Sequence, residues 1–252
     1  MGHYRFWHVA GMEWIKLRSV RSAWWTIALA VAAAAGIAVQ AGSGVTSTAD
    51  VTRSALSGGT LAGVLLVSVL GVLTMTSEYT SGMIRSTLAA APRRPLVLAA
   101  KAAVFGAVAL VAGEVAAFAS FTAGGLALKQ GVAAPALSQP GVLRAVALTG
   151  ASYCLIGLLG LGLGTITRNT TSGIVVLVAG VYVAAQLAGK LVNLARYAPL
   201  NIVQNSLAVP RQVCTSGPVP CPLSAWAGMS VLAAYAAAAL LIGGCILARR
   251  DA

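Results

Sequence analysis

Three groups of residues have side chains that could take part in chemistry or binding. The first is a polar island over residues 78–101, between two long apolar runs. Its charged residues are Glu78, Arg85, Arg93, Arg94 and Lys101. The second is Glu114, a lone acid inside an apolar run, and the third is the pair Cys214 and Cys221 in a proline-rich segment. These groups could respectively grip a partner, carry a proton or contact a cation, and form a disulfide.

The island contains the pattern of a short amphipathic helix over residues 80–91. Its residues at helical spacing are Met83, Ile84, Thr87, Leu88 and Ala91. Gly82 lies near the start of this helix, and Pro92 ends it, because a proline ring disfavours helix in the preceding residue. Pro95 suits the first turn of the next helix, where its missing N–H is no loss.

Glu114 admits two interpretations. Acids inside membrane-spanning helices are costly and usually face a cavity or a partner, which makes Glu114 a candidate substrate-cation contact or proton carrier. A carboxyl group that bonds neighbouring helices accounts for the same residue, and a shifted pKa would distinguish the two.

The cysteine pair also has two interpretations. A disulfide between Cys214 and Cys221 is favoured if their loop faces an oxidising compartment, and free thiols are the alternative. We expect no metal site, because the histidines of the chain, His3 and His8, lie far from this loop in the sequence.

Composition indicates a membrane protein. The chain has 252 residues, of which 58% are hydrophobic and 9% charged, and its mean hydropathy is +0.87. Soluble domains are about a quarter charged. The net charge of +12 fits loops that face an anionic membrane leaflet, and no arginine-rich run with interleaved aromatics points to nucleic acid.

The apolar runs predict an all-α polytopic protein with one transmembrane domain over residues 1–252. Six runs approach the 20 or so residues that cross a bilayer. They are 24–40, 59–76, 102–128, 145–167, 171–189 and 225–248. The fourth run is rich in glycine, which lets helices approach closely in lipid. Residues 190–224 form an outer loop in which 200–209 could re-enter the membrane.

Residues 4–21 predict an interfacial amphipathic helix. Trp7 and Trp14 lie on one face at headgroup depth, and Lys16 and Arg18 are expected on the aqueous side. Glu13 can pair with Lys16 at i, i+3. An ordinary cap helix at the membrane surface is a compatible alternative.

The distribution of basic residues predicts the topology. Six spans bring both termini to one side, together with the polar island. Eleven lysines and arginines fall on that side and six on the other. The positive-inside rule therefore predicts that both termini and the island are cytoplasmic.

Motifs of common enzymes are absent from the sequence. It contains no G-x-x-x-x-G-K-[ST] phosphate loop, no H-E-x-x-H and no G-x-S-x-G. We therefore expect a chain that is not an enzyme and that holds no ATP in the P-loop manner.

The island resembles the membrane-spanning permease subunit of ABC type-2 exporters, of the actinobacterial six-helix type. The residues that carry the resemblance are Glu78, Gly82, Arg85, Leu88, Pro92, Arg93 and Lys101. Residues 13–19 and 247–251 also resemble members of this type, so the resemblance covers nearly the whole chain. The Cys214/Cys221 loop is a departure from the common pattern.

The resemblance implies an efflux transporter of the bacterial plasma membrane. The N-terminal helix would be its connecting helix, residues 198–207 its re-entrant element, and the island its coupling helix, seated in a separate ATPase. The implied coupling residues are Glu78, Gly82, Met83, Ile84, Arg85, Leu88, Pro92 and Arg93. Glu78 and Arg85 would tie the coupling helix to the connecting helix. The active unit would hold two permease subunits, as a homodimer or, alternatively, a heterodimer, and two ATPase subunits that bind ATP and Mg.

Two rival functions predict different behaviour. A proton-coupled secondary transporter would use Glu114 and need no ATPase, and it would be expected to show inverted repeats, of which the sequence has no clear trace. A non-transport scaffold would tolerate any change in the island that kept the fold. The sequence leaves the substrate open among drugs, lipids and peptides.

Overall fold

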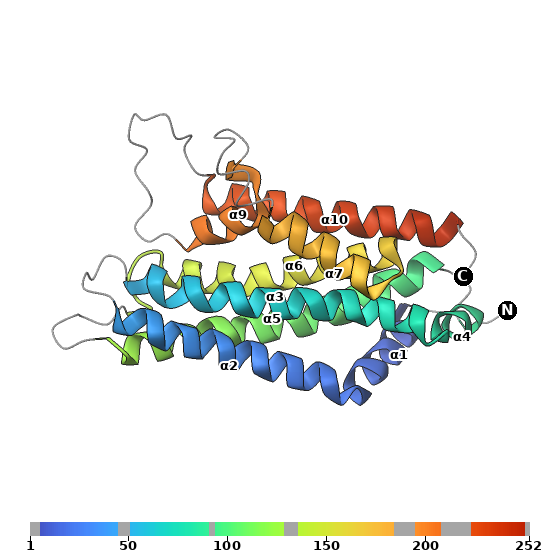
Figure 1. Ribbon diagram of the computed structural model, residues 1–252, viewed down its shortest axis with the longest axis horizontal. Coiled ribbons are helices and arrows are strands. Elements are labelled where there is room, and N and C mark those ends of the chain that lie inside the picture. Colours follow the sequence, from blue (N-terminus) through green and yellow to red (C-terminus); the bar gives the residue numbers. More distant parts are fainter. Residues whose placement is uncertain are drawn as a thin grey trace.

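The computed structural model describes residues 6–44, 51–90, 94–128, 136–183, 195–207 and 223–249, and every regular element in these ranges is a helix. The long helices lie side by side in an elongated bundle (Figure 1). In chain order the elements are α1 Phe6–Ser19, α2 Arg21–Ser43, α3 Val51–Thr80, α4 Met83–Ala90, α5 Arg94–Leu126, α6 Val142–Thr167, α7 Thr170–Val178, the π-helical turn η2 Ala179–Val183, the 3-10 turn η3 Ala195–Tyr197, α9 Pro199–Ser206 and α10 Ala225–Arg249.

Five of these helices are long and apolar enough to cross a membrane: α2, α3 over Gly59–Thr80, α5, α6 and α10. They confirm the all-helical, membrane-spanning character predicted from composition. The expected span 171–189 begins as α7 and continues through η2 to Val183, and its remaining residues lie outside the described ranges. The expected count of six spans therefore stays a prediction.

Helices α3 and α6 form the centre of the bundle. In each of them 61% of the most apolar stretch is buried, against 22% in α2 and 28% in α10. Glycines make the close contact between them possible, because a Cβ on Gly71 would clash with the Gly157 carbonyl oxygen and one on Gly160 with the Ser68 carbonyl oxygen. This confirms the close helix approach predicted from the glycine spacing.

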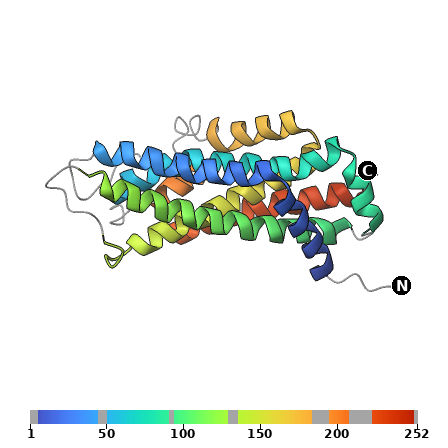
Figure 2. The ribbon, with the colours of Figure 1, turned by 90° about the horizontal axis from the view of Figure 1, so that it is seen from below.

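Helices α1 and α2 meet at an elbow. The residue between them, Val20, has φ −84° and ψ 97°, so its extended backbone interrupts what would otherwise be one long helix. Helix α1 then lies obliquely across the start of α5 (Figure 2). The elbow leaves α2 within the bundle while α1 turns back toward α5.

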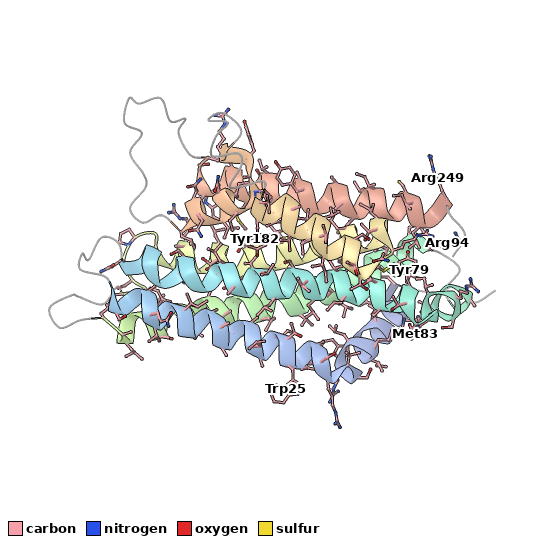
Figure 3. The ribbon with its side chains drawn as sticks, in the orientation of Figure 1. Trp25, Tyr79, Met83, Arg94, Tyr182 and Arg249 are labelled. Carbon is pink, nitrogen blue, oxygen red and sulfur yellow. The ribbon has the colours of Figure 1, made fainter. Side chains whose placement is uncertain are left out.

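One end of the bundle gathers α1, α4 and the C-terminal end of α10 (Figure 1). Met83, Tyr79, Arg94 and Arg249 lie toward this end (Figure 3). The guanidinium of Arg94 donates a hydrogen bond to the Leu247 carbonyl oxygen at 3.1 Å, which joins the start of α5 to the end of α10. We call this the α4 end.

Within the segment 190–224, expected to be an outer loop, the structure describes the 3-10 turn η3 and the helix α9, and α9 lies at the opposite end of the bundle (Figure 1). Ile202 and Val203 of α9, and Leu207 directly after it, are buried, and α9 packs against α10 and α6. The segment 198–207 contains this helix, and its re-entry into the membrane stays a prediction. Cys214 and Cys221 lie outside the described residues.

The glycine contact between α3 and α6 makes a testable prediction. We expect Gly160→Ala to destabilise the protein by about 1–3 kcal/mol, because the added methyl group overpacks a helix interface made of backbone. Thermal unfolding in detergent, followed by light scattering, measures this effect.

The matched control is Gly36→Ala in the middle of α2, where a Cβ meets no atom within 4 Å. That change should leave the melting temperature unaltered or raise it, since alanine is favoured over glycine in a helix by up to about 1 kcal/mol. Equal melting temperatures of the two variants would contradict the packing argument.

Candidate functional site

Four charged side chains from three helices meet near the α4 end. Glu13 and Lys16 come from α1, Glu78 from the end of α3 and Lys101 from α5. The Lys101 ammonium lies 2.5 Å from Glu13 Oε2 and 2.9 Å from Glu78 Oε1. The Lys16 ammonium lies 3.0 Å from Glu13 Oε1 and 3.0 Å from Glu78 Oε1. We call these four residues the ion-pair cluster.

The ion-pair cluster is buried and electrically balanced. Glu13, Glu78 and Lys101 are each no more than 3% exposed, while the side chain of Lys16 is 29% exposed. An unpaired charge in such a place would cost several kcal/mol, but two acids opposite two lysines carry no net charge. Burial alone would lower the pKa of Lys16, but Glu13 and Glu78 outweigh this effect and raise its pKa above the ordinary value. Lys16 is therefore positively charged at neutral pH.

The cluster also holds the short helix α4. Lys16 donates a hydrogen bond to the Thr87 hydroxyl oxygen at 3.0 Å, and the Thr87 hydroxyl donates to the Met83 carbonyl oxygen at 3.0 Å. Ile84, on the same side of α4, is buried. One face of α4 is thus fastened to the bundle through Lys16.

The opposite face of α4 is exposed to the surroundings. Arg85, Ser86 and Ala89, which point away from Ile84 and Thr87, are all exposed. A helix with one anchored face and one free face, at the end of a bundle, has the form of a docking element.

A turn at Gly82 sets the direction of α4. Gly82 has φ +71°, a left-handed conformation in which residues other than glycine are strained. Its N–H donates to the Tyr79 carbonyl oxygen at 3.2 Å, and its own carbonyl oxygen accepts from the Arg85 N–H at 3.2 Å. A Cβ added to Gly82 would meet no atom within 4 Å, so backbone conformation, not space, is the reason for glycine here.

A cavity of about 290 Å³ lies beside the cluster, between the α1–α2 elbow and the end of α3. Glu13, Lys16, Glu78 and Lys101 all contribute to its lining. The second oxygen of the Glu78 carboxylate, Oε2, is buried and has no hydrogen-bond partner among the described residues. Glu78 Oε2 could therefore accept a further hydrogen bond, whereas both carboxylate oxygens of Glu13 already accept one.

The residues that resemble the family's coupling motif are brought together only in part. Glu78 contacts the N-terminal helix, as expected, through Lys16. Arg85 is exposed and makes no ion pair within the described part of the chain, so it takes no part in this tie. Pro92 and Arg93 lie outside the described residues, and the side chain of Leu88 is not described.

The interfacial helix differs from expectation in the placement of Lys16. We expected this lysine on the aqueous face, but its ammonium lies in the ion-pair cluster. The expected pair of Glu13 with Lys16 is confirmed. The reason for the difference is that α1 packs on α5 through Val9, Glu13 and Leu17, so the Glu13 carboxylate is buried. Lys16 turns inward because it pairs with this carboxylate.

Sequence reasoning missed that Glu13 and Lys101 belong to one site. A signal was available, because the chain has only five acids and most of its length is apolar. Acids in or next to apolar runs are usually paired with a cation. Lys101 directly precedes the third apolar run, so it was a candidate partner.

Glu114 lies on α5, away from the ion-pair cluster. Its carboxyl group packs over Gly150 of α6, where a Cβ would clash with it. It makes no hydrogen bond or ion pair with another residue in the described ranges. A packing contact, not a hydrogen bond between side chains, therefore joins α5 and α6 at this point.

Across the described ranges, no group of three histidine, cysteine, aspartate or glutamate residues is placed to hold a metal ion. No family model matches the chain, and no curated protein matches it.

The cluster predicts a large cost for removing one charge. Glu78→Gln leaves two lysines facing Glu13 alone, and we expect a loss of about 3–5 kcal/mol, since breaking a buried ion pair leaves an uncompensated charge. The melting temperature in detergent measures this loss.

A second variant tests whether charge balance is the cause. Glu78→Gln combined with Lys101→Met restores neutrality and keeps the Glu13–Lys16 pair. We expect the double variant to be more stable than Glu78→Gln alone, a non-additive result that contacting residues give. Losses that simply add would show that the cluster is not electrostatically coupled.

Proposed function

We propose that this chain is the permease subunit of an ATP-binding-cassette exporter, with α4 as the helix that docks into a separate ATPase. The observation that carries the proposal is the ion-pair cluster, which fastens α1 and α4 to α3 and α5 while the outer face of α4 stays exposed. The resemblance of the island to the family's coupling segment supports the same assignment.

The cluster provides a route by which a force on α4 reaches the membrane-spanning helices. A push on α4 is carried through Thr87 to Lys16, and from Lys16 to Glu78 on α3. Lys101 passes it to α5, because its ammonium bonds both acids. Buried, short ion pairs resist displacement better than exposed ones, so the four helices would move together at this end.

In this proposal ATP and Mg bind to the partner ATPase, and two copies of each subunit form the transporter. ATP binding would close the ATPases, and the permease homodimer would alternate between inward-open and outward-open states. The α4 end would face the cytoplasm of a bacterial cell, as the excess of basic residues on that side favours.

The proposal predicts that an acidic residue on the free face of α4 abolishes ATPase binding. We expect Ala89→Glu to reduce the ATPase activity that co-purifies with the tagged chain from its native membrane at least about tenfold, because a charge buried in a docking interface without a partner costs more than about 1.4 kcal/mol. The measurement is ATP hydrolysis per mole of tagged chain in mild detergent, with the ATPase identified and counted.

The matched control is Leu137→Glu. Leu137 is an exposed apolar residue, as Ala89 is, but it follows α5 at the opposite end of the bundle. This variant should keep its ATPase. Loss of activity in both variants, or in neither, would refute docking through α4.

A proton-coupled transporter is the second candidate, and it is favoured by one observation: Glu114 has no ionic or hydrogen-bonding partner among the described residues. In that case the wild-type chain would purify without an ATPase. Flux in vesicles would then follow a proton gradient and be lost in Glu114→Gln, whereas Ala89→Glu would leave it unchanged.

A further inference from the structure

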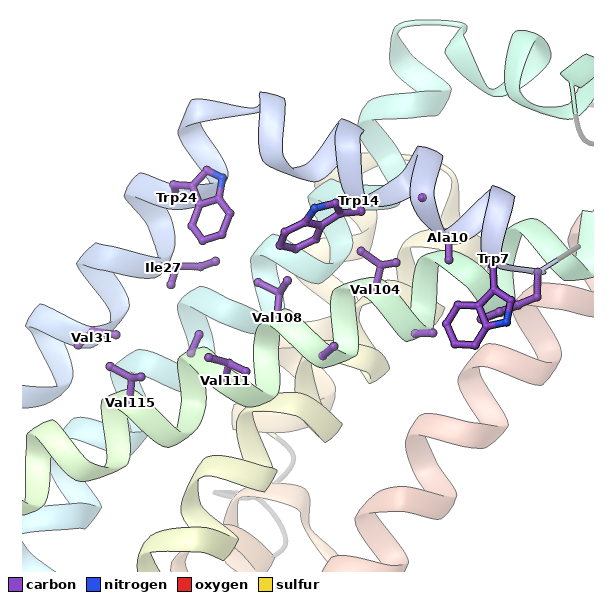
Figure 4. Close-up of a pocket in the computed structure, with 15 residues that line it drawn as sticks. Trp7, Ala10, Trp14, Trp24, Ile27, Val31, Val104, Val108, Val111 and Val115 are labelled. Carbon is purple, nitrogen blue, oxygen red and sulfur yellow. The ribbon is translucent and has the colours of Figure 1, made fainter.

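An apolar groove of about 770 Å³ lies between α1, α2 and α5, in the angle that the α1–α2 elbow makes over α5 (Figure 4). This volume is in the range of sites that hold small molecules. Three tryptophans, Trp7, Trp14 and Trp24, line it together with valines of α5. The ion-pair cluster lies on the other face of α1, so the groove is a separate feature.

The α5 wall of the groove is slightly longer than one membrane leaflet. It runs from Ala103 to Val115, which at 1.5 Å per residue is about 18 Å. Half of a hydrocarbon core of about 30 Å is about 15 Å. The indoles of Trp14 and Trp24, one from each arm of the elbow, lie over this wall, and Trp7 lies beyond its Val104 end (Figure 4). The wall is therefore long enough for a single acyl chain.

The lining is open to the surroundings instead of being covered by the chain itself. Val111 is 64% exposed and Val115 52% exposed, although both line the groove. Trp25, which follows Trp24, is 76% exposed and points away from the bundle (Figure 3). In a membrane these surfaces meet hydrocarbon, so the medium that fills the groove is apolar.

The elbow beside the groove is positively charged. Arg18 and Arg21 flank the elbow and are exposed, and the Trp24 indole N–H donates to the Arg18 carbonyl oxygen at 3.3 Å. Glu13, the acid of α1, is buried and paired with Lys16 and Lys101, so it does not offset these charges. The charges favour an anionic group at the elbow.

We propose that the groove binds one acyl chain of an anionic phospholipid, with its phosphate at Arg18 and Arg21 and its chain against the valines of α5. The apolar lining, the length of the α5 wall and the basic elbow each match one part of such a molecule. The inference does not depend on an ATPase partner, since it uses only α1, α2 and α5. A second copy of this chain is the competing occupant.

Tryptophan fluorescence tests the proposal directly. The chain has five tryptophans. Changing Trp25 and Trp226 to phenylalanine leaves the three that line the groove. The variant with these two changes is placed in vesicles of phosphatidylcholine with a minor fraction of phosphatidylglycerol. Two samples are compared: in one the acyl chains of phosphatidylglycerol carry bromine, which quenches tryptophan fluorescence, and in the other those of phosphatidylcholine do.

We expect brominated phosphatidylglycerol to quench more strongly, mole for mole, than brominated phosphatidylcholine. An arginine near an anionic surface favours binding about fivefold. Arg18→Gln together with Arg21→Gln should therefore remove most of the preference. Arg249→Gln, an exposed arginine at the end of α10, is the matched control and should retain it.

A filling variant tests the chain-binding part. Ala107, an exposed small residue on the α5 wall, is changed to phenylalanine to occupy the groove, and Leu110, which is 40% exposed but lies outside it, receives the same change as control. Ala107→Phe should abolish the preference and Leu110→Phe should keep it.

Two outcomes would overturn the proposal. One is equal quenching by the two brominated lipids, which indicates ordinary bilayer contact. The other is quenching that disappears when nanodiscs hold two copies of the chain instead of one, because a second copy then fills the groove.

Discussion

The compensation of buried charge at the α4 end is the constraint on which the rest of the structure depends. Two acids and two lysines lie in a bundle that is otherwise almost entirely apolar, and none of the four would be tolerated there alone. The helices that carry these charges, α1, α3 and α5, must therefore pack so that the four side chains meet at one point. The cluster therefore fixes how α1, α3 and α5 meet, and Thr87 adds α4 to the same arrangement.

This constraint gives the two ends of the bundle different characters. At the α4 end, directional ion pairs and hydrogen bonds join α1, α3, α4 and α5, so a displacement of one of these helices acts on the other three. Along the centre, α3 and α6 are held by glycine contacts that have no direction beyond close packing. At the opposite end, α9 is held by apolar burial of Ile202, Val203 and Leu207. A signal that enters at α4 thus meets the part of the molecule best able to transmit it.

Much of the fold could be predicted from the sequence, because apolar length and helix-breaking residues are local signals. Pro95 lies in the first turn of α5, as predicted, and Gly82 lies at the turn before α4. The cluster could not be predicted in full, because its partners are remote: Glu13 and Lys101 are 88 residues apart. The periodicity of α1 alone shows which residues share a face, but it does not show that the face with Glu13 packs against α5. For that reason the sequence alone places Lys16 in water.

The position of α1 connects the cluster with the groove. One face of this helix carries Val9, Glu13 and Leu17 into the bundle, and Trp7 and Trp14 line the groove on its other side. Since the ion pairs set how α1 lies on α5, they also set the width of the groove. Helix α1 therefore lies against two neighbours, the groove in which we propose a lipid and, through the Lys16–Thr87 hydrogen bond, α4. A change in the groove that tilted α1 would move the Lys16 anchor of α4, and a displacement of α4 would act on the groove by the same contact.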